Sequence, residues 1–289
     1  MARRVAVVIP AYMEGEGIVS VLDRIAEAVE SDCEVLVVVD SADDPTVEVV
    51  RRYSERDLRV RNVVNSYGRG PANAIRFGID STDCPVVVVT MADGSDDPRQ
   101  IDDLARLVER GVVIAAASRY MPGGRQVGGP LAKGLMSRAA GVSLQMFARV
   151  GTRDATNSFK AYSADFVRRV GVDSRYGFEI GLELTAKARR LRLPVGEIPT
   201  IWLDRTSGAS NFKVRESIPH YLRWYRLAFG PKLSAEALRR RVDRLVGVGS
   251  GRAGFLPDDT TVPVVAGAVP VVAGASEAAN PDAEVGSPR

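Results

Sequence analysis

The sequence predicts an α/β fold, with a mostly parallel central sheet covered by helices on both faces. Three observations predict it. Short β-branched runs alternate with helical stretches along the first part of the chain, which is typical of parallel sheets with helices on both sides. One of these runs, Val86–Thr90, is apolar enough to be a buried strand. Polar and acidic residues follow several of the runs, at the strand ends where ligands bind in folds of this class.

The individual elements can be justified in chain order. The first strand ends at Pro10 instead of continuing into the apolar core of a signal peptide. Helices are expected to begin at Pro45, Pro71 and Pro98, because proline suits the first helical position. The expected strands are Val5–Ile9, Glu34–Val39, Val60–Val63, Val86–Thr90 and Val112–Ala117, and the expected helices are Ile18–Glu30, Pro45–Glu55, Pro71–Asp80 and Pro98–Arg110.

The composition excludes several classes of protein. The 289 residues include 39 basic and 36 acidic side chains, a net charge of +3, which does not fit a dedicated nucleic-acid binder. The one histidine, His220, excludes a Ser-His-Asp triad and two-histidine metal sites. Cys33 and Cys84 are too few for a disulfide framework, so a reducing, cytoplasmic compartment is expected. No segment has the roughly 18 uninterrupted apolar residues of a membrane-spanning helix.

Three parts are expected along the chain. Residues 1–230 form the main folded domain, 231–246 a basic C-terminal helix, and 247–289 a disordered tail. The tail is rich in Gly, Ala, Val and Pro and has no helical or strand period. It is acidic, so the preceding part is more basic than the whole chain.

Two of the expected strands end in acidic clusters. Asp93 and Asp96 follow Val86–Thr90, and paired carboxylates there suit Mg²⁺ or Mn²⁺ bridging a diphosphate. Asp97 is better explained as the cap of the next helix, because it directly precedes Pro98. After Glu34–Val39, Asp40 is expected to bind a base or ribose, whereas Asp44 caps the following helix.

A glycine-rich turn precedes the helix that begins at Pro71. Gly68, Arg69 and Gly70 place backbone amides and a cation at a helix N-terminus, where an anion binds favourably. The turn is neither a P-loop nor a Rossmann fingerprint, so by itself it is weak evidence.

Taken together and in order, the motifs resemble family 2 glycosyltransferases, and among them the dolichol-phosphate or polyprenyl-phosphate sugar synthases. The resemblance covers about residues 4–230 and implies the GT-A fold. It rests on Val8–Glu14, Val38–Asp40, Gly68–Ala74, Met91–Asp93, Ala117–Tyr120, Asp154 with Ser158–Tyr162, Glu197–Pro199 and Arg205–Ser210.

The resemblance implies a role for each matching residue. The implied catalytic residues are Asp93, Arg119 and Arg205. The implied donor-binding residues are Pro10, Tyr12, Glu14, Asp40, Arg69, Gly70, Ala92, Asp93 and Ser210. The implied acceptor-binding residues are Lys133, Ser137, Arg138, Asp154 and Glu183. The implied metal ligand is Asp93, and Ser95 and Asp96 are candidates for further oxygen ligands.

The chain departs from the family pattern at four positions. Met13 stands where the family has Asn, and Met91 replaces the first acid of an Asp-x-Asp pair. Ser158 replaces a glycine, and Asn211 replaces a lysine. The second departure leaves one aspartate of the pair, Asp93, to hold the metal.

Three helical segments have two interpretations each. Residues 127–150 mix apolar and basic side chains and form either a core helix or an acceptor-binding helix at a membrane interface. Residues 217–245 place aromatic side chains beside cations, which suits a lipid headgroup boundary or a helical hairpin with a solvated basic face. Glu179 and Glu183 share a helix face near the expected site, but Glu183 and Lys187 also fit an exposed ion pair.

The predicted function is metal-dependent transfer of a sugar from a nucleotide-diphosphate donor to a polyprenyl phosphate, with peripheral membrane contact as a further hypothesis. Arg119, Lys133 and Arg138 would position the acceptor phosphate, which needs no general base. One alternative is a soluble hydroxyl acceptor with Asp154 or Glu183 as base. The other is a non-catalytic nucleotide-sugar binding module. The sugar and the base of the donor stay open.

Overall fold

The computed structural model describes residues 3–204 and 214–247 of the chain, and its central feature is a seven-stranded sheet. The strands run in the order β3-β2-β1-β4-β7-β5-β8. All neighbours pair in parallel except β7, which is antiparallel to both β4 and β5. These strands are β1 (Val5–Pro10), β2 (Cys33–Val39), β3 (Val60–Val64), β4 (Val86–Val89), β5 (Ile114–Ser118), β7 (Lys160–Ser163) and β8 (Val195–Pro199). The α/β class with a mostly parallel sheet is therefore confirmed.

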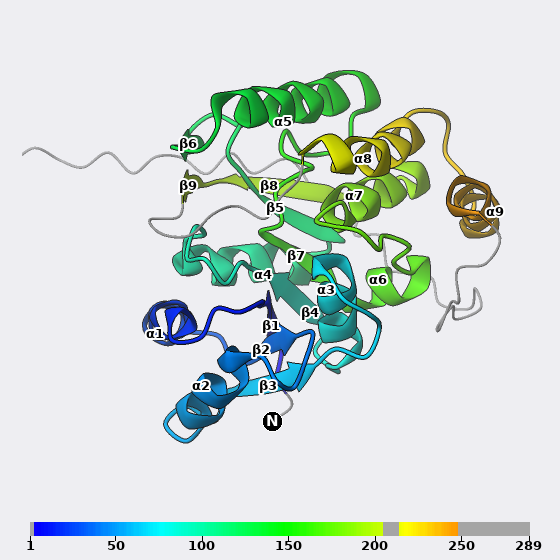
Figure 1. Ribbon diagram of the computed structural model, residues 1–289. Coiled ribbons are helices and arrows are strands. Elements are labelled where there is room, and N and C mark those ends of the chain that lie inside the picture. Colours follow the sequence, from blue (N-terminus) through cyan, green and yellow to red (C-terminus); the bar gives the residue numbers. More distant parts are fainter. Residues whose placement is uncertain (1–2, 205–213, 248–289) are drawn as a thin grey trace, which may run out of the picture.

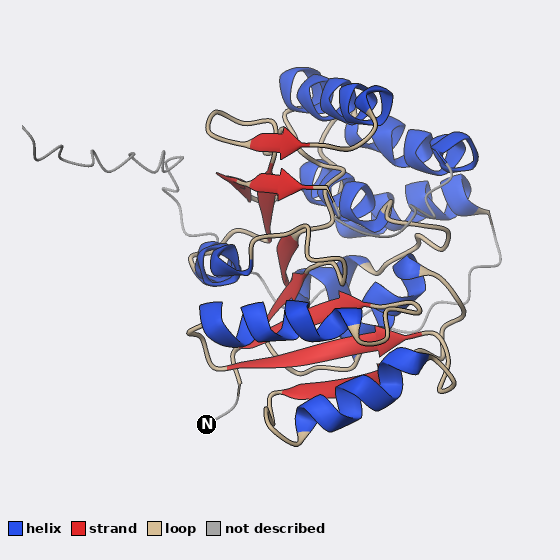
Figure 2. Ribbon diagram, turned by 60° about the vertical axis from the view of Figure 1, so that its left-hand side comes forward, coloured by secondary structure: helices blue, strands red, loops and turns tan. Residues whose placement is uncertain are grey.

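Helices cover both faces of the sheet, as Figures 1 and 2 show. The side chains of β1 alternate between two cores: Val7 packs with α1, α2 and α4, whereas Val8 packs with α3, α6 and α7. These helices are α1 (Gly17–Ala28), α2 (Pro45–Ser54), α3 (Pro71–Asp80), α4 (Ile101–Glu109), α6 (Ala164–Val170) and α7 (Ile180–Leu191). The period of two along the strand divides one run of valines between two cores.

The helix starts follow the expected capping chemistry. Asp44 accepts a hydrogen bond from the backbone N of Thr46 at 2.9 Å, and Asp97 accepts one from Arg99 N at 3.1 Å. The capping interpretation of both residues is confirmed. The expected helix Pro98–Arg110 is divided into a 3₁₀ turn, Pro98–Gln100, and α4.

A second layer lies on the β5–β8 side of the sheet. Strands β6 (Arg125–Val127) and β9 (Ile201–Leu203) form a separate parallel pair, and α5 (Leu131–Ser143) continues into a π-helical turn, Leu144–Ala148. In Figure 1, α5 lies along the top of the molecule, next to α8.

The C-terminal helices correct one expectation. Helices α8 (Val214–Ala228) and α9 (Ala235–Val246) pack on α7, and α9 begins four residues after the expected boundary at 231. Trp224 is 0% exposed and belongs to a core with Leu227 and Leu238. The headgroup-boundary interpretation of these aromatic residues is therefore wrong for Trp224, and the segment is a helix pair that shares a core with α7 and the π-helical turn. Except for Gly247, the expected tail lies outside the described residues.

We predict that Gly78→Ala lowers the free energy of unfolding by about 1–3 kcal/mol, because overpacking a tight core forces side chains and backbone to shift. A Cβ at Gly78, in α3, would lie 2.5 Å from Val8 Cγ1 and 3.0 Å from Val38 Cγ2. Urea denaturation measures the change. Gly17→Ala is the matched control, because a Cβ at this other helical glycine meets no atom within 4 Å. Equal effects of the two substitutions would contradict the close approach of α3 to the sheet.

Candidate active site

The topology brings three strand-end loops to one edge of the sheet. Strand β1 lies between β2 and β4, so the chain order reverses beside β1. In open α/β sheets, ligands bind outside the carboxyl ends of the strands at such a switch point. The loops that meet there are residues 11–16 after β1, Asp40 with its neighbours after β2, and Met91–Asp97 after β4.

Asp40 organises the glycine turn. Its Oδ1 accepts a hydrogen bond from Asn65 Nδ2 at 2.9 Å, and its Oδ2 accepts one from Gly70 N at 2.8 Å. Asn65 also donates to the carbonyl of Gly68 at 2.7 Å. Gly68 and Gly70 have φ angles of 100° and 110°, which L-residues with a side chain rarely adopt. The structure thus brings Asp40 and the turn that contains Arg69 together. The role of Asn65 was missed, because a lone Asn after a strand carries no distinctive signal.

The loop after β1 is held by the cap of α2. The backbone N of Met13 donates to Asp44 Oδ2 at 2.9 Å, and the backbone N atoms of Glu14 and Gly15 each donate to Thr46 Oγ1 at 3.1 Å. Met13 has a φ of 57°, a left-handed conformation. Tyr12 is 62% exposed, so its ring is open to a ligand at this edge. Pro10 ends β1 and is buried. The cap therefore fixes the loop that contains two of the expected donor-binding residues, Tyr12 and Glu14, directly after a third, Pro10.

The acidic loop after β4 gathers oxygen atoms. Asp93 Oδ1 accepts a hydrogen bond from Ser95 N at 3.1 Å. Asp96 is buried, and its Oδ2 accepts hydrogen bonds from Thr90 Oγ1 and Met91 N, each at 3.0 Å. Burial, reinforced by the negative charge of Asp93, raises the pKa of Asp96 to about 6. Within the described residues, Ser95 Oγ is buried without a hydrogen-bond partner. Ala92, between Met91 and Asp93, is buried.

This loop offers only oxygen donors, which is the ligand chemistry of Mg²⁺ and Mn²⁺. Two carboxylates and an orphaned buried hydroxyl lie within four consecutive residues there, 93–96. Over residues 3–204 and 214–247, no three His, Cys, Asp or Glu side chains are grouped as a metal site. A site with one or two carboxylates is what Mg²⁺ uses when phosphate oxygens complete its coordination. The residues present fit a cation of this kind.

Arg119 and Asp154 form a buried ion pair. Arg119 Nε and Nη2 lie 2.7 Å and 2.9 Å from the two carboxylate oxygens, and Arg119 N donates to Oδ2 at 3.0 Å. Asp154 is 0% exposed. Burial acts against the charge of Arg119, but its bonds to Asp154 outweigh burial and raise its pKa. The sequence motifs imply separate roles for these two residues, whereas in the structure they form one bidentate ion pair.

The ion pair contacts α5 through Ser137. Arg119 Nη2 donates to Ser137 Oγ at 3.4 Å, and Ser137 Oγ lies 2.6 Å from Thr156 Oγ1. The side chain of Arg138, the next residue of α5, is exposed. Lys133 lies in the first turn of α5, and its side chain is outside the described part of the structure. Of the expected acceptor residues, Ser137 and Asp154 are thus gathered around Arg119.

Glu183 is engaged in a second buried network. Its two carboxylate oxygens accept hydrogen bonds from Asp173 N and Ser174 N at 2.7 Å and 2.8 Å. Lys187 Nζ lies 2.5 Å from Glu183 Oε1 and 2.7 Å from Asp173 Oδ2. The expected pair of Glu183 and Lys187 forms, but both side chains are buried, so the expectation of an exposed pair was wrong.

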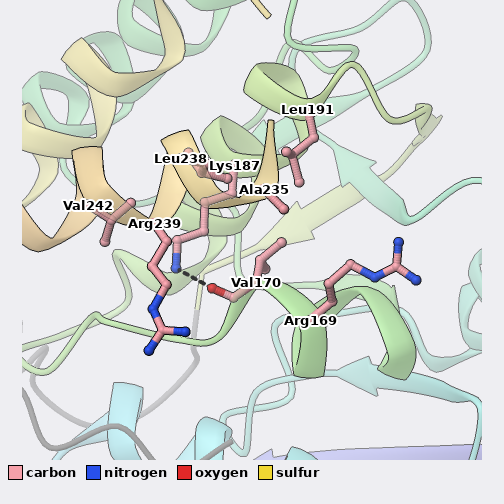
Figure 3. Close-up of a pocket in the computed structure, with 8 residues that line it drawn as sticks. All are labelled: Arg169, Val170, Lys187, Leu191, Ala235, Leu238, Arg239 and Val242. Atoms are coloured by element: carbon pink, nitrogen blue, oxygen red, sulfur yellow. Dashed lines mark hydrogen bonds between the residues drawn. The ribbon is translucent and has the colours of Figure 1, made fainter. Parts of the chain in front are cut away.

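A small pocket lies behind this network, between α6, α7 and α9 (Figure 3). Lys187 reaches it and donates to the carbonyl of Val170 at 3.2 Å. None of the expected site residues lines this pocket. Arg205 and Ser210, which were expected to contact the donor diphosphate, lie outside the described residues.

Comparisons with known proteins agree with this geometry. The family model described as glycosyl transferase family 2 matches residues 6–171. The chain is 30% identical to the undecaprenyl-phosphate mannosyltransferase of Micrococcus luteus, over 76% of this chain and 93% of that protein. It is 27% identical to the polyprenol monophosphomannose synthase of Mycolicibacterium smegmatis, over 85% of this chain and 91% of that protein.

A solved structure shares the fold. The mannosyltransferase PcManGT of Pyrobaculum calidifontis, in complex with GDP-Man and Mn²⁺, superposes with a TM-score of 0.57 at 18% sequence identity. The match covers 85% of this chain and 70% of that chain. The GT-A fold implied by the sequence motifs is confirmed.

We predict that Glu183→Gln lowers the free energy of unfolding by about 1–3 kcal/mol, because a Gln amide has one acceptor oxygen and leaves one of the buried N–H groups of Asp173 and Ser174 without a partner. Chemical denaturation measures the loss. Glu55→Gln is the control, since Glu55 pairs with Arg51 at 2.9 Å but is 68% exposed, and its substitution should shift the unfolding midpoint little. Equal shifts for both variants would contradict a structural role for Glu183.

Proposed function

The chain belongs to glycosyl transferase family 2, and from this premise we propose that it transfers a sugar from a nucleotide-diphosphate donor to a polyprenyl phosphate with the help of Mg²⁺ or Mn²⁺. Relatives named for undecaprenyl-phosphate mannosyl transfer and polyprenol monophosphomannose synthesis support this acceptor class. A structural neighbour that contains GDP-Man and Mn²⁺ supports the donor class and the metal.

One observation carries the choice of acceptor. A hydroxyl acceptor needs a general base, for which the chain offered Asp154 and Glu183 as candidates. Both are buried, and both are engaged by cations, Asp154 by Arg119 and Glu183 by Lys187. A carboxylate held in this way is poorly placed to take a proton. A phosphate acceptor is already anionic and needs no base, so these ion pairs favour it.

The donor fits the edge of the sheet beside β1. The turn held by Asp40 lies at the N-terminus of α3, where the helix dipole favours an anionic or polar part of a nucleotide. The loop of Asp93, Ser95 and Asp96 would hold the divalent cation. When bound, the cation offsets the negative charge that develops on the departing diphosphate.

The acceptor fits the neighbouring group around Arg119. Its guanidinium, next to Ser137, would hold the acceptor phosphate so that one phosphate oxygen faces the anomeric carbon of the donor. The bond from that oxygen to the anomeric carbon forms as the bond to the diphosphate breaks. Direct attack inverts the anomeric centre. No proton has to move, which agrees with a single histidine in the chain.

The outer face of α5 supports peripheral contact with a membrane. Its inward face is small and polar: a Cβ at Gly141 would lie 2.1 Å from the carbonyl O of Arg153, and Ser137 bonds Thr156. Its outward face is apolar, with Leu131 91% exposed and Leu135 71% exposed. A soluble helix has the opposite arrangement. Arg138 is exposed on the same helix, which suits an anionic lipid surface.

Peripheral contact suits the acceptor as well. Ser137 lies on the inward side of α5, beside the proposed phosphate site. The same helix would therefore contact both the membrane, through its outward face, and the acceptor phosphate, through its inward face. No helix among the described residues is both long and apolar enough to span a bilayer.

Radiolabelled sugar transfer tests the proposed function directly. A panel of nucleotide sugars is offered with a prenyl phosphate and Mg²⁺ or Mn²⁺, and the label is expected in an organic-extractable, mild-acid-labile product. Label that enters only water-soluble products would support the hydroxyl-acceptor alternative. Donor binding without any transfer would support a binding module.

Asp93→Asn should reduce transfer by about a hundredfold or more while the protein stays folded, because it weakens the charge compensation of the leaving group. Calorimetry should also show that Mn²⁺ no longer strengthens donor binding. Asp97→Asn is the matched control: Asp97 caps the turn that begins at Pro98 and pairs with Arg99 at 2.8 Å, so its loss should leave turnover near the wild-type rate. Unchanged metal dependence in Asp93→Asn would place the cation elsewhere.

The double variant Leu131→Asp, Leu135→Asp should lose flotation with vesicles that contain phosphatidylglycerol, since burying one leucine side chain contributes about 1.5–3 kcal/mol. Leu58→Asp is the control, because Leu58 is 84% exposed but lies between α2 and β3. Flotation of the double variant at the wild-type level would remove α5 from the contact. A wild-type dimer in solution that the double variant abolishes would assign the face to a second copy of the chain.

A further inference from the structure

Lys160 is a buried cation that the proposed mechanism leaves without a role. It is the first residue of β7, the strand between β4 and β5, and it is 0% exposed. Its Nζ donates to the backbone carbonyls of Asp154 at 3.2 Å and Ala155 at 3.3 Å, and to that of Asn157. A lysine ammonium has three N–H groups, and here one loop supplies acceptors for all three.

The same loop contains the carboxylate that binds Arg119. Asp154 O accepts from Lys160, while both carboxylate oxygens of Asp154 face the guanidinium of Arg119. The loop is also fixed by Asn157, whose Nδ2 donates to Ala117 O at 2.8 Å. Lys160 therefore fixes the backbone of the loop, whereas Arg119 binds its carboxylate.

The charge of this group depends on Lys160. Arg119 and Asp154 alone would be neutral. The ammonium of Lys160 is close enough to both, and to Asp96, for their charges to affect its titration, and its nearest partners are carbonyl dipoles. The buried lysine Lys187, in contrast, is held by two carboxylates. With Lys160 protonated and Asp96 ionised, the four side chains together are neutral, and without the ammonium they have a net charge of −1, which would repel a phosphate.

We propose that Lys160 is a positioning residue for the acceptor phosphate: it fixes the loop of Asp154 and provides a buried positive charge that offsets the carboxylates of Asp154 and Asp96 beside Arg119. The inference rests on the proposed function, because it concerns the acceptor site of that reaction. It assigns no contact between Lys160 and substrate.

Gly181 provides a second way to test the arrangement. It lies in the first turn of α7, and a Cβ there would be 3.4 Å from Lys160 Nζ, 3.2 Å from Asn157 O and 3.5 Å from Ala155 O. Gly181→Ala would therefore press on the ammonium and two of its acceptors without any change of charge.

Titration of Lys160 provides an independent readout. Burial lowers its pKa to about 8; the negative charges of Asp154 and Asp96 oppose this shift, and the positive charge of Arg119 adds to it. Above that pH the ammonium loses its proton, and the group of Arg119, Asp154, Asp96 and Lys160 becomes one charge more negative. The unfolded chain keeps the proton up to its ordinary pKa of 10.5, so over this interval the unfolded state binds more protons than the folded one. The contribution of Lys160 to stability then rises with pH while acceptor binding weakens.

The test measures KM for a short-chain, water-soluble prenyl phosphate from pH 7 to 9. Lys160→Met should raise this KM about tenfold with little change in KM for the donor, since misplacing a binding group can reduce rates by up to about 10²-fold. The rise in wild-type KM above about pH 8 should be absent from this variant. Gly181→Ala should give a smaller rise in KM and keep the pH break. Lys232→Met, which removes an exposed lysine, should behave as wild type.

A folded Lys160→Met enzyme with the wild-type acceptor KM and the same rise above pH 8 would overturn the inference. If that variant does not fold, the wild-type pH profile and Gly181→Ala provide the test. The inference would be overturned if the wild-type acceptor KM does not rise above pH 8 and Gly181→Ala has the wild-type acceptor KM. If the wild type transfers no sugar to any prenyl phosphate, the proposed function fails separately. Inorganic phosphate then serves as the probe: it should raise the Tm of wild type but not of Lys160→Met, and equal shifts would overturn the inference.

Discussion

The buried ion pair of Arg119 and Asp154 is the interaction on which the proposed acceptor half of the site depends. Asp154 is 0% exposed, so its charge requires a partner, and the bidentate guanidinium provides one at 2.7 Å. The pair joins the end of β5 to the loop that precedes β7. Through Ser137 and Thr156 it also fixes α5, the helix whose apolar face points away from the sheet. Loss of the pair would release three elements together, because each is anchored on the same two side chains.

The proposed donor half depends instead on hydrogen bonds between side chains and backbone N atoms. Strand order places the loops after β1, β2 and β4 together, and hydrogen bonds from side chains to backbone N atoms then fix their shapes. Asp44 and Thr46 hold the loop after β1, while Asp40 holds the glycine turn. Such bonds orient backbone groups before a ligand arrives, so less ordering is needed on binding. The proposed donor half is thus shaped by hydrogen bonds between side chains and the backbone, and the proposed acceptor half by a buried ion pair.

The strands, helix starts and loops around the proposed donor half could be predicted from the sequence, because their signals are local. Parallel strands are short apolar runs, and acids placed directly after them are visible in the sequence. The acceptor half depends on pairs distant in the chain, which periodicity does not reveal. Arg119 and Asp154 were expected to act separately, and Lys187 was expected to be exposed. Strand β7 was not expected at all, because it is short, runs antiparallel to both neighbours and begins with a buried lysine. Likewise, Trp224 was expected at a lipid headgroup boundary, but in the structure it is buried among residues of α7 and α9. The sequence could not show this, because these helices are distant from it in the chain or pack on it only in the fold.

A double-mutant cycle on Arg119→Met and Asp154→Asn tests the central ion pair most directly. The free energies of unfolding of the wild type, the two single variants and the double variant are measured by chemical denaturation. Residues in one buried pair show coupling energies of about 0.5–3 kcal/mol, and we expect a value near the upper end because the pair is bidentate and Asp154 is fully buried. The double variant should then be more stable than the sum of the single losses predicts. Additivity within about 0.3 kcal/mol would contradict the account, because it would mean that the two side chains stabilise the fold independently.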